Sequence, residues 1–286
     1  MISLQMAASL TAFVIGAMGV LGLLVGSFLN VVAFRVPAGR SIVSPPSACP
    51  SCSTAIRPYD NIPVISWLVL RGRCRDCRTP ISFRYPLVEA ATGVFFAVVA
   101  WWSWGRIATE FAASTAAAIA SVLELIALLS FAAVSVVLTL IDLDTHRLPD
   151  AVVFPSFGAG AVLLGTTAFL RGDLGAAVGM VVGAIALFVF YFIVAWIRPG
   201  GMGMGDVKLA ALVGLFLGYL GWSQLVVGAF AAFLFGGIFV VGLLATRRVT
   251  RHGGIPFGPW MLAGAWFGVF LGPWVAQTYL SLTGLS

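Results

Sequence analysis

Eight long apolar segments constrain the fold of this chain more than any other feature of its sequence. A transmembrane helix needs about 20 mostly apolar residues, and each segment meets or nearly meets that length. The chain is also 60% hydrophobic and only 9% charged, which is far from the composition of soluble domains. The sequence therefore predicts an all-α integral membrane protein with about eight transmembrane helices. The predicted spans are residues 8–34, 86–104, 117–141, 152–170, 174–197, 207–222, 224–245 and 257–281.

The basic residues predict how these spans are oriented. Eight arginines lie in residues 35–84, and cytoplasmic loops are enriched in arginine and lysine. If this loop is cytoplasmic, alternation of the spans leaves only Arg106 and Arg171 outside and puts both termini in the periplasm. The same placement accounts for the net charge of +6 without a basic domain that binds nucleic acid. The remaining basic residues on the cytoplasmic side are Arg147, Arg198, Lys208, Arg247, Arg248 and Arg251.

All four cysteines lie in the loop between the first two predicted spans. They form two CxxC pairs, Cys49 with Cys52 and Cys74 with Cys77, separated by 21 residues. This spacing is typical of a structural zinc site with four thiolate ligands, and a reducing cytoplasm argues against disulfides. Four free thiols are the alternative. Zinc would give so long a loop its structure, with Trp67 and nearby aliphatic residues as a small core.

The predicted organisation has three parts. Residues 1–34 form the first span, residues 35–85 a cytoplasmic, zinc-ribbon-like loop, and residues 86–286 a seven-span membrane core. The sixth and seventh spans are the hardest to separate, because only Gly221 and its neighbours divide them.

Two carboxylates are predicted to meet at the cytoplasmic face. Asp142 lies in "LTLIDLDTHRLPD" at the end of the third span, and Asp206 begins the sixth span. Two close carboxylates do not ionise together easily, so one retains a proton while the other stays charged. Such a pair can activate water and protonate the leaving amine, as in peptide hydrolysis of the aspartic kind. The alternative is that both aspartates merely mark helix ends.

The other acids differ in how strongly their positions suggest a role. Glu89 and Glu124 fall inside apolar spans, where an ionisable residue is costly and marks a functional site by default. Glu89 could instead pair with Arg84 near the cytoplasmic end. Asp144 lies off the face that Asp142 presents and is the weaker partner. Asp60 and Asp76, in the cysteine loop, are expected to be solvated or to cap local turns. Glu110 and Asp173 are expected to lie in external loops and to have no special role.

The stretch "GGMGMGDVKLA" places Asp206 on a pliable backbone. It does not fit a phosphate loop, because lysine does not follow its last glycine. Gly203 and Gly205 are expected to let the backbone leave helical geometry, so that a substrate strand can approach Asp206. Lys208 is the only lysine in the chain. It is expected to anchor the beginning of the sixth span at the membrane interface or to bias the nearby Asp206 electrostatically. The two histidines, His146 and His252, lack the spacing of a catalytic zinc site.

Six motifs occur in order along most of the chain. They are "GSFLNVVAFRVP", the double CxxC around "YDNIP", "ISFRYPLVE", "IDLDTHRLPD", "GMGDVKL" and "IPFGP". In these motifs the chain resembles the bacterial type IV prepilin peptidases, the leader peptidase and N-methyltransferase family of GxGD aspartic proteases. The resemblance runs from Gly26 to about Ala265 and implies that Asp142 and Asp206 are the catalytic aspartates.

The resemblance also implies an activity, a substrate and a place in the cell. Members of this family, in the bacterial inner membrane, remove a short basic leader after a glycine from type IV prepilins and type II secretion pseudopilins. They then methylate the new N-terminal residue with S-adenosylmethionine. No glycine-rich pattern locates a methyl-donor site, so methylation rests on the resemblance and on the cysteine loop, which shorter, cleavage-only relatives lack. Asp60, Asp144 and Asp150 are candidates to offset the repulsion between a basic leader and the arginines.

Two alternative functions are left open by the sequence. One is a peptidase without methyltransferase activity. The other is a proton-coupled transporter that uses Asp142, Asp206 and Glu89 as a relay. Transporters of that kind often contain inverted repeats, and none is evident between the two halves of this chain.

Overall fold

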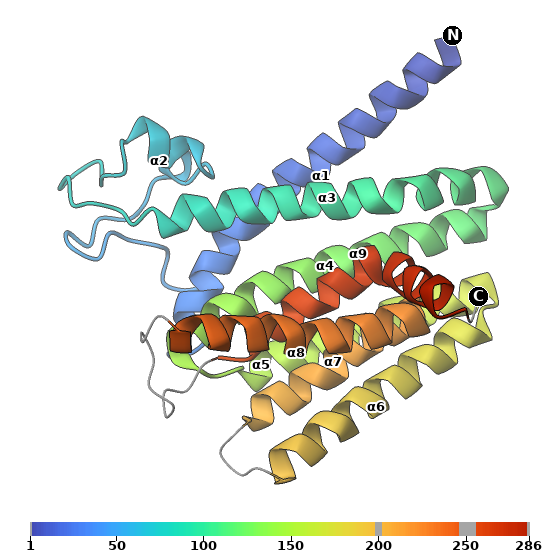
Figure 1. Cartoon of the computed structure of the whole chain (residues 1–286). Helices are drawn as coiled ribbons and strands as arrows, with labels where there is room; N and C mark the ends of the chain where they lie inside the picture. The colour runs from blue at the N-terminus through green and yellow to red at the C-terminus, as the bar shows by residue number, and fades with distance from the viewer. Residues whose placement is uncertain (1, 198–201, 246–255, 285–286) are drawn as a thin grey trace. The chain divides into compact units, whose positions relative to one another are not determined.

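The computed structural model describes residues 2–197, 202–245 and 256–284, which are helical apart from the cysteine loop and short connections (Figure 1). Several residues used above lie outside the described part, namely Arg198, Gly200, Gly201, Arg247, Arg248, Arg251, His252 and Ile255. The elements are α1 (Ile2–Arg35), η1 (Pro58–Asp60), α2 (Ile65–Val69), α3 (Arg84–Ala113), α4 (Thr115–Thr145), α5 (Asp150–Arg171), α6 (Leu174–Ile197), α7 (Met204–Leu220), α8 (Trp222–Ala245) and α9 (Gly258–Thr283).

The helices confirm the predicted all-α membrane fold. Seven of the described helices are long and apolar enough to cross a bilayer: α1, α3, α4, α5, α6, α8 and α9. The helix α7 corresponds to the sixth predicted span and has 17 residues, or about 26 Å at 1.5 Å per residue, against a hydrocarbon core of about 30 Å. The total of eight spans therefore stays a prediction.

Contacts divide the chain into two compact units. The first contains Met1–Thr109 and Leu128–Val137, and the second contains Glu110–Ala127 and Leu138–Ser286. The first unit holds the cysteine loop, and the second holds both predicted catalytic aspartates.

Small residues let α1 approach α3 closely within the first unit. A Cβ added to Gly22 would lie 2.6 Å from the Thr92 carbonyl oxygen, and one added to Gly26 would lie 2.8 Å from the Glu89 Cα. Only glycine fits where two helix backbones come this near. Near the same end, Asn30 Nδ2 donates to the Tyr85 carbonyl oxygen at 3.2 Å, so the end of α1 is fastened to the beginning of α3.

The second unit is organised around α7, whose side chains are buried on every face from Leu209 to Tyr219 apart from Ala211. Helices that are apolar all round are found in the interior of membrane bundles. The neighbouring helix α6 meets α7 through a GxxxG pair on each, Gly179 with Gly183 and Gly214 with Gly218, where added Cβ atoms would collide with the opposite backbone. This contact fixes α7, and with it the glycine stretch at its beginning.

Candidate active site and metal centre

Asp142 lies in the last turn of α4, which continues to Thr145 rather than ending at residue 141. The helix stops at His146, whose left-handed conformation (φ 51°) lets its N–H bond back to the Asp142 carbonyl oxygen. Asp142 is only 4% exposed, and its Oδ2 accepts the Gly258 N–H at 3.0 Å. Because Gly258 begins α9, this donor is one of the N–H groups that a helix start leaves without a partner.

Asp206 lies in the first turn of α7. Its Oδ2 accepts the N–H of Gly203 at 3.2 Å, so the side chain caps the helix that carries it. Gly203 has the extended backbone of an N-cap (φ −78°, ψ 149°), as expected for a backbone outside helical geometry. Gly205, in contrast, lies inside α7, so its role differs from the one expected from sequence.

Leu148 joins the two aspartate segments. A Cβ added to Gly205 would lie 3.0 Å from Leu148 Cβ, and one added to Gly258 would lie 3.5 Å from Leu148 Cδ1. The same added atom on Gly258 would lie 2.7 Å from Asp142 Oδ2. Gly205 and Gly258 therefore permit a close approach of α7 and α9 to the α4–α5 connection. The Asp142 and Asp206 carboxylates come near enough to interact electrostatically.

Aromatic side chains line the surroundings of this pair. Tyr191 of α6 is buried, and its phenol lies within electrostatic range of Asp206. Its ring packs against Phe257 at 6.2 Å and Phe233 at 5.4 Å between centroids. Phe257 directly precedes Gly258, so the aromatic cluster connects both aspartates. Gly258 belongs to the motif "IPFGP" and could have been predicted as a site residue from it. Tyr191 could not, because nothing in the sequence distinguishes it from the other residues of its apolar run.

Asp144, Asp150 and Lys208 lie near the aspartate pair in sequence, but Asp144 is on another helix face and the other two bind each other. Asp144 is exposed, because two residues along a helix is a turn of about 200° away from the Asp142 face. Lys208 binds Asp150 at 2.7 and 2.9 Å and lies over the ring of Phe154. The lysine thus ties the beginning of α7 to the beginning of α5, and Asp150 is engaged with it.

Glu89 is part of the first unit and serves the cysteine loop there. Its Oε2 accepts the N–H of Val64 at 2.7 Å. Val64 is the N-cap of α2 and has a left-handed φ of 62°. The buried carboxylate therefore holds the backbone at the beginning of α2, a contact that the expected pairing with Arg84 did not include.

Glu124 is the buried member of a partly buried charge cluster in the second unit. Arg171 binds Glu124 and the Tyr219 hydroxyl through Nη1, and Glu110 through Nη2 at 2.9 Å. The expectation that Glu110 lies in an external loop is wrong, because α3 continues to Ala113. Asp173 directly precedes α6 and caps it by accepting the Ala176 N–H, a local role that was not expected from the sequence.

Replacing Glu124 by alanine should destabilise the second unit by about 3 kcal/mol, since it removes a buried carboxylate and leaves the half-buried Arg171 short of one partner. Thermal unfolding of the purified protein in detergent would measure the change. Glu110→Ala is the matched comparison and should cost less, because its side chain is 20% exposed against 6% for Glu124. A Glu124→Ala protein that unfolds at the wild-type temperature would contradict the structural role.

The four cysteines converge as predicted. Their sulfur atoms lie within 4.8 Å of one another, and those of Cys49 and Cys77 are 3.6 Å apart. Sulfur atoms around a tetrahedral metal with bonds of about 2.3 Å lie about 3.8 Å apart. The cluster therefore has the donor set and the spacing to hold a metal ion.

Each CxxC pair forms the same small turn. The Cys49 N–H bonds to the Thr54 carbonyl oxygen and the Cys74 N–H to the Thr79 carbonyl oxygen, at 3.0 and 2.9 Å. The residues that follow the second cysteine of each pair, Ser53 and Arg78, both have left-handed backbones. Ser53 N–H and Arg78 N–H then bond back to the carbonyl oxygens of Cys49 and Cys74. The two turns are thus equivalent, at an offset of 25 residues.

Hydroxyl groups prepare two of the thiols for a metal. Thr54 Oγ1 lies 3.4 Å from Cys52 Sγ, and Thr79 Oγ1 lies 3.2 Å from Cys77 Sγ. Hydrogen bonding with Thr79 lowers the pKa of the Cys77 thiol to about 6, and hydrogen bonding with Thr54 lowers the pKa of the Cys52 thiol. Metals bind the thiolate form, so these contacts favour metal binding at neutral pH.

The core of the cysteine loop is smaller than expected. Trp67 packs edge-on against Phe83 with 5.6 Å between ring centroids, and its Nε1 donates to the Ile81 carbonyl oxygen. Gly72, at a φ of 64°, lets the chain pass directly over the indole. The sequence predicted that nearby aliphatic residues complete this core, but they are exposed. The reason is that α2 has only five residues and can bury only one of its faces. These exposed residues are Ile62, Ile65, Leu68 and Val69.

The loop acids Asp60 and Asp76 are paired rather than merely solvated. Arg75 binds Asp60 through two nitrogens, and this contact lowers the pKa of the Asp60 carboxyl group. Arg57 binds Asp76 at 3.3 Å. Asp60 and Asp150, both candidates to offset the charge of a basic leader, are therefore already neutralised by basic residues of the chain.

Replacing Gly258 by alanine should lower activity at the aspartate pair by about 100-fold, the effect of a misplacement of about 1 Å. The new methyl group would displace the Asp142 carboxylate, which can swing aside without unfolding the helix. Gly237→Ala in α8 is the control, since an added Cβ there meets nothing within 4 Å. Initial rates and melting temperatures of both variants check the prediction. Equal rates for the two would show that the Gly258 contact does not position Asp142.

Comparison with known proteins identifies relatives over nearly the whole chain. The family model described as type IV leader peptidase family matches residues 129–241, and that of the bacterial peptidase A24 N-terminal domain matches residues 20–103. The prepilin leader peptidase/N-methyltransferase of Burkholderia pseudomallei is 36% identical, covering 93% of this chain and 87% of that protein. The proteins of the same name from Pseudomonas aeruginosa and Stutzerimonas stutzeri are 34% and 33% identical, covering 92% and 96% of each chain. No solved structure matches.

Proposed function

Since the chain belongs to the type IV leader peptidase family, we propose that it is a membrane aspartic endopeptidase with Asp142 and Asp206 as its catalytic pair. It removes the short basic leader from type IV prepilins and type II secretion pseudopilins after a glycine. It then methylates the new N-terminal residue with S-adenosylmethionine. The observation that carries the catalytic assignment is the convergence of two carboxylates from α4 and α7 beside the beginning of α9.

The two carboxylates divide the chemistry of hydrolysis between them. One accepts a proton from a water molecule, which attacks the scissile carbonyl carbon, and the other donates a proton to the nitrogen of the leaving amine. The N–H of Gly258 holds one oxygen of Asp142, and the N–H of Gly203 holds one oxygen of Asp206. Each carboxylate thereby keeps a fixed direction while its second oxygen can face water or substrate.

The location of the pair suits a substrate that is itself a membrane protein. The aspartates lie at the ends of apolar helices, at the face that the basic residues mark as cytoplasmic. A leader that precedes a membrane helix would reach this level from the cytoplasm, and the apolar helices offer a place for the pilin's own hydrophobic segment. We therefore propose that the active site lies at the cytoplasmic face of the inner membrane and that both termini lie in the periplasm.

The cysteine cluster is proposed to bind a structural zinc ion. Four thiolates close a tetrahedral site and leave no position for a reacting group, so zinc would support the fold of the loop and take no part in hydrolysis. The loop, at residues 35–85 between the first span and the membrane core, is proposed to be needed for methylation. The reason is that the shorter family members without such a loop cleave only.

One assay tests cleavage and methylation together. The purified protein is incubated with a prepilin, with and without S-adenosylmethionine, and the product masses are determined. We expect loss of the leader in both reactions and the added mass of one methyl group only when S-adenosylmethionine is present. A product that is cleaved but never methylated would show that the protein is a peptidase without methyltransferase activity. Absence of cleavage with any pilin-like substrate would favour the transporter instead.

A further inference from the structure

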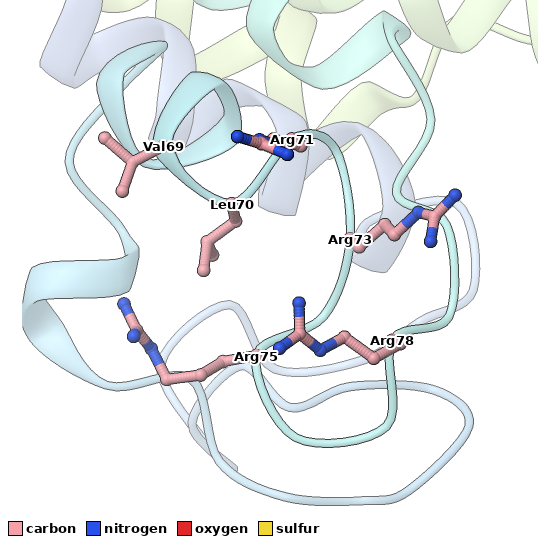
Figure 2. A pocket seen from close by; sticks show the side chains of 6 residues that line it. All are labelled: Val69, Leu70, Arg71, Arg73, Arg75 and Arg78. Carbon is pink, nitrogen blue, oxygen red and sulfur yellow. The ribbon is translucent and has the colours of Figure 1, made fainter.

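A basic pocket opens in the cysteine loop. Its volume is about 520 Å³, and its walls are Val69, Leu70, Arg71, Arg73, Arg75 and Arg78. Figure 2 shows the guanidinium groups of Arg71, Arg75 and Arg78 around the space into which Leu70 points, whereas the Arg73 side chain is directed away from that space. Neither the metal cluster nor the aspartate pair uses this pocket.

The pocket carries positive charge that the protein does not neutralise. Arg75 is paired with Asp60, whereas Arg71, Arg73 and Arg78 have no acidic partner within the part of the chain that the structure describes. The nearby Asp76 is bound to Arg57. Three guanidinium groups are therefore available to an anion, and guanidinium binds phosphate through two parallel hydrogen bonds.

The first CxxC turn shows that the metal site does not need these arginines. At the offset of 25 residues, Ala48, Pro50 and Ser53 occupy the positions of Arg73, Arg75 and Arg78. Both turns nevertheless make the same backbone hydrogen bonds and the same left-handed step after the second cysteine. The positive charge of the second turn must therefore have a cause other than the fold of the turn.

Exposed apolar side chains adjoin the pocket. Ile62, Ile65, Leu68 and Val69 are 47%, 57%, 61% and 70% exposed, and Val69 also lines the pocket. Apolar residues beside arginines are typical of segments that lie in the interface of an anionic membrane. A free phosphate would use the arginines and leave these aliphatic side chains in water.

The loop is held close to a membrane surface by its two ends. It connects α1 to α3, both of which are long and apolar enough to span a bilayer. The hydrogen bond from Asn30 to Tyr85 keeps the end of α1 beside the beginning of α3. The two ends of the loop therefore lie at the same depth relative to the membrane, and lipid headgroups at that depth are within reach of the loop.

We propose that the pocket binds the phosphate of an anionic phospholipid headgroup, with Ile65, Leu68 and Val69 inserted at the level of the upper acyl chains. Arg71 and Arg78 donate to the phosphate oxygens, and Arg73, in the pocket wall, adds to the positive charge there. The site would fasten the cysteine loop to the membrane surface independently of peptide cleavage.

Native mass spectrometry of the full chain in detergent, titrated with phosphatidylglycerol or phosphatidylcholine, tests the proposal. We expect tighter retention of phosphatidylglycerol, and a loss of roughly fivefold in its affinity for each arginine removed in the variant Arg71→Gln/Arg73→Gln/Arg78→Gln. Arg40→Gln, in the same loop but outside the pocket, is the control and should bind like the wild type. Zinc content measured on each protein verifies that the loop is folded.

Hydrogen exchange of the full chain in nanodiscs distinguishes the sources of the phosphate. Residues 62–78 should exchange more slowly in discs of equal parts phosphatidylglycerol and phosphatidylcholine than in phosphatidylcholine alone, and the triple variant should lose this difference. Equal protection by inorganic phosphate in phosphatidylcholine discs, or protection by an acidic peptide alone, would overturn the lipid assignment. So would a zinc-loaded triple variant with wild-type affinity for phosphatidylglycerol.

Discussion

Replacing Asp206 by asparagine should reduce prepilin cleavage by about 10³-fold or more, because the variant keeps the shape of the side chain and loses its acid–base chemistry. Asparagine can still accept the Gly203 N–H, so the beginning of α7 should keep its cap and the protein its stability. Asp142→Asn should have an effect of the same size. Since the two residues act as one unit, the double variant should be no worse than either single variant.

Asp144→Asn provides the matched control for this prediction. It lies two residues from Asp142 on the same helix and carries the same charge, but it is exposed and on another face. Its cleavage rate should stay within about threefold of the wild type, as expected for a surface carboxylate outside the reaction. Substantial cleavage by the folded Asp206→Asn protein would remove the aspartate pair as the catalytic group.

The membrane fold and the aspartate pair could both be predicted from the sequence, for a common reason. In a chain that is 60% hydrophobic, apolar runs define the helices, and each charged residue within or beside a run is conspicuous. Asp142 and Asp206 were considered together because they end and begin two spans at the same face, with mere helix-end markers as the alternative. The ordered motifs then connected them to a family whose members the chain matches over most of its length.

The partners of these residues could not be predicted, because they depend on how helices distant in sequence meet. Arg171 and Glu124 are 47 residues apart, and the arginine was interpreted only as a charge in an outer loop. Tyr191 lies within a run of apolar residues, where an aromatic side chain is equally compatible with lipid contact and with burial. Its burial follows from the close packing of α6 on α7, which the spacing of four glycines permits.

The ends of the helices were also predicted incorrectly. The helices α3 and α4 continue past their predicted ends, at residues 104 and 141, to Ala113 and Thr145. The added turns include charged residues, which a hydropathy criterion excludes although helices accept them readily. This difference brought Glu110 into a helix and into the charge cluster around Arg171.

Replacing Cys74 and Cys77 by serine should abolish metal binding, with zinc falling from about one ion per chain to none. Metal binding supplies about 10–16 kcal/mol to small zinc domains, and two of the four ligands would be lost. The core around Trp67 is too small to replace that contribution, so the loop should open and become sensitive to protease between residues 35 and 84. Zinc analysis and limited proteolysis measure both effects.

The two activities should respond differently to this loss of metal. Both aspartates and their backbone donors, Gly203 and Gly258, belong to the second unit, whereas the cysteine cluster belongs to the first. Cleavage should therefore persist in the double cysteine variant while methylation falls below detection. Ser51→Ala, between the first two cysteines, is the control and should keep both activities. Full methylation by a zinc-free protein would separate the loop from the methyl-transfer reaction, and loss of cleavage as well would show that the peptidase site depends on the metal.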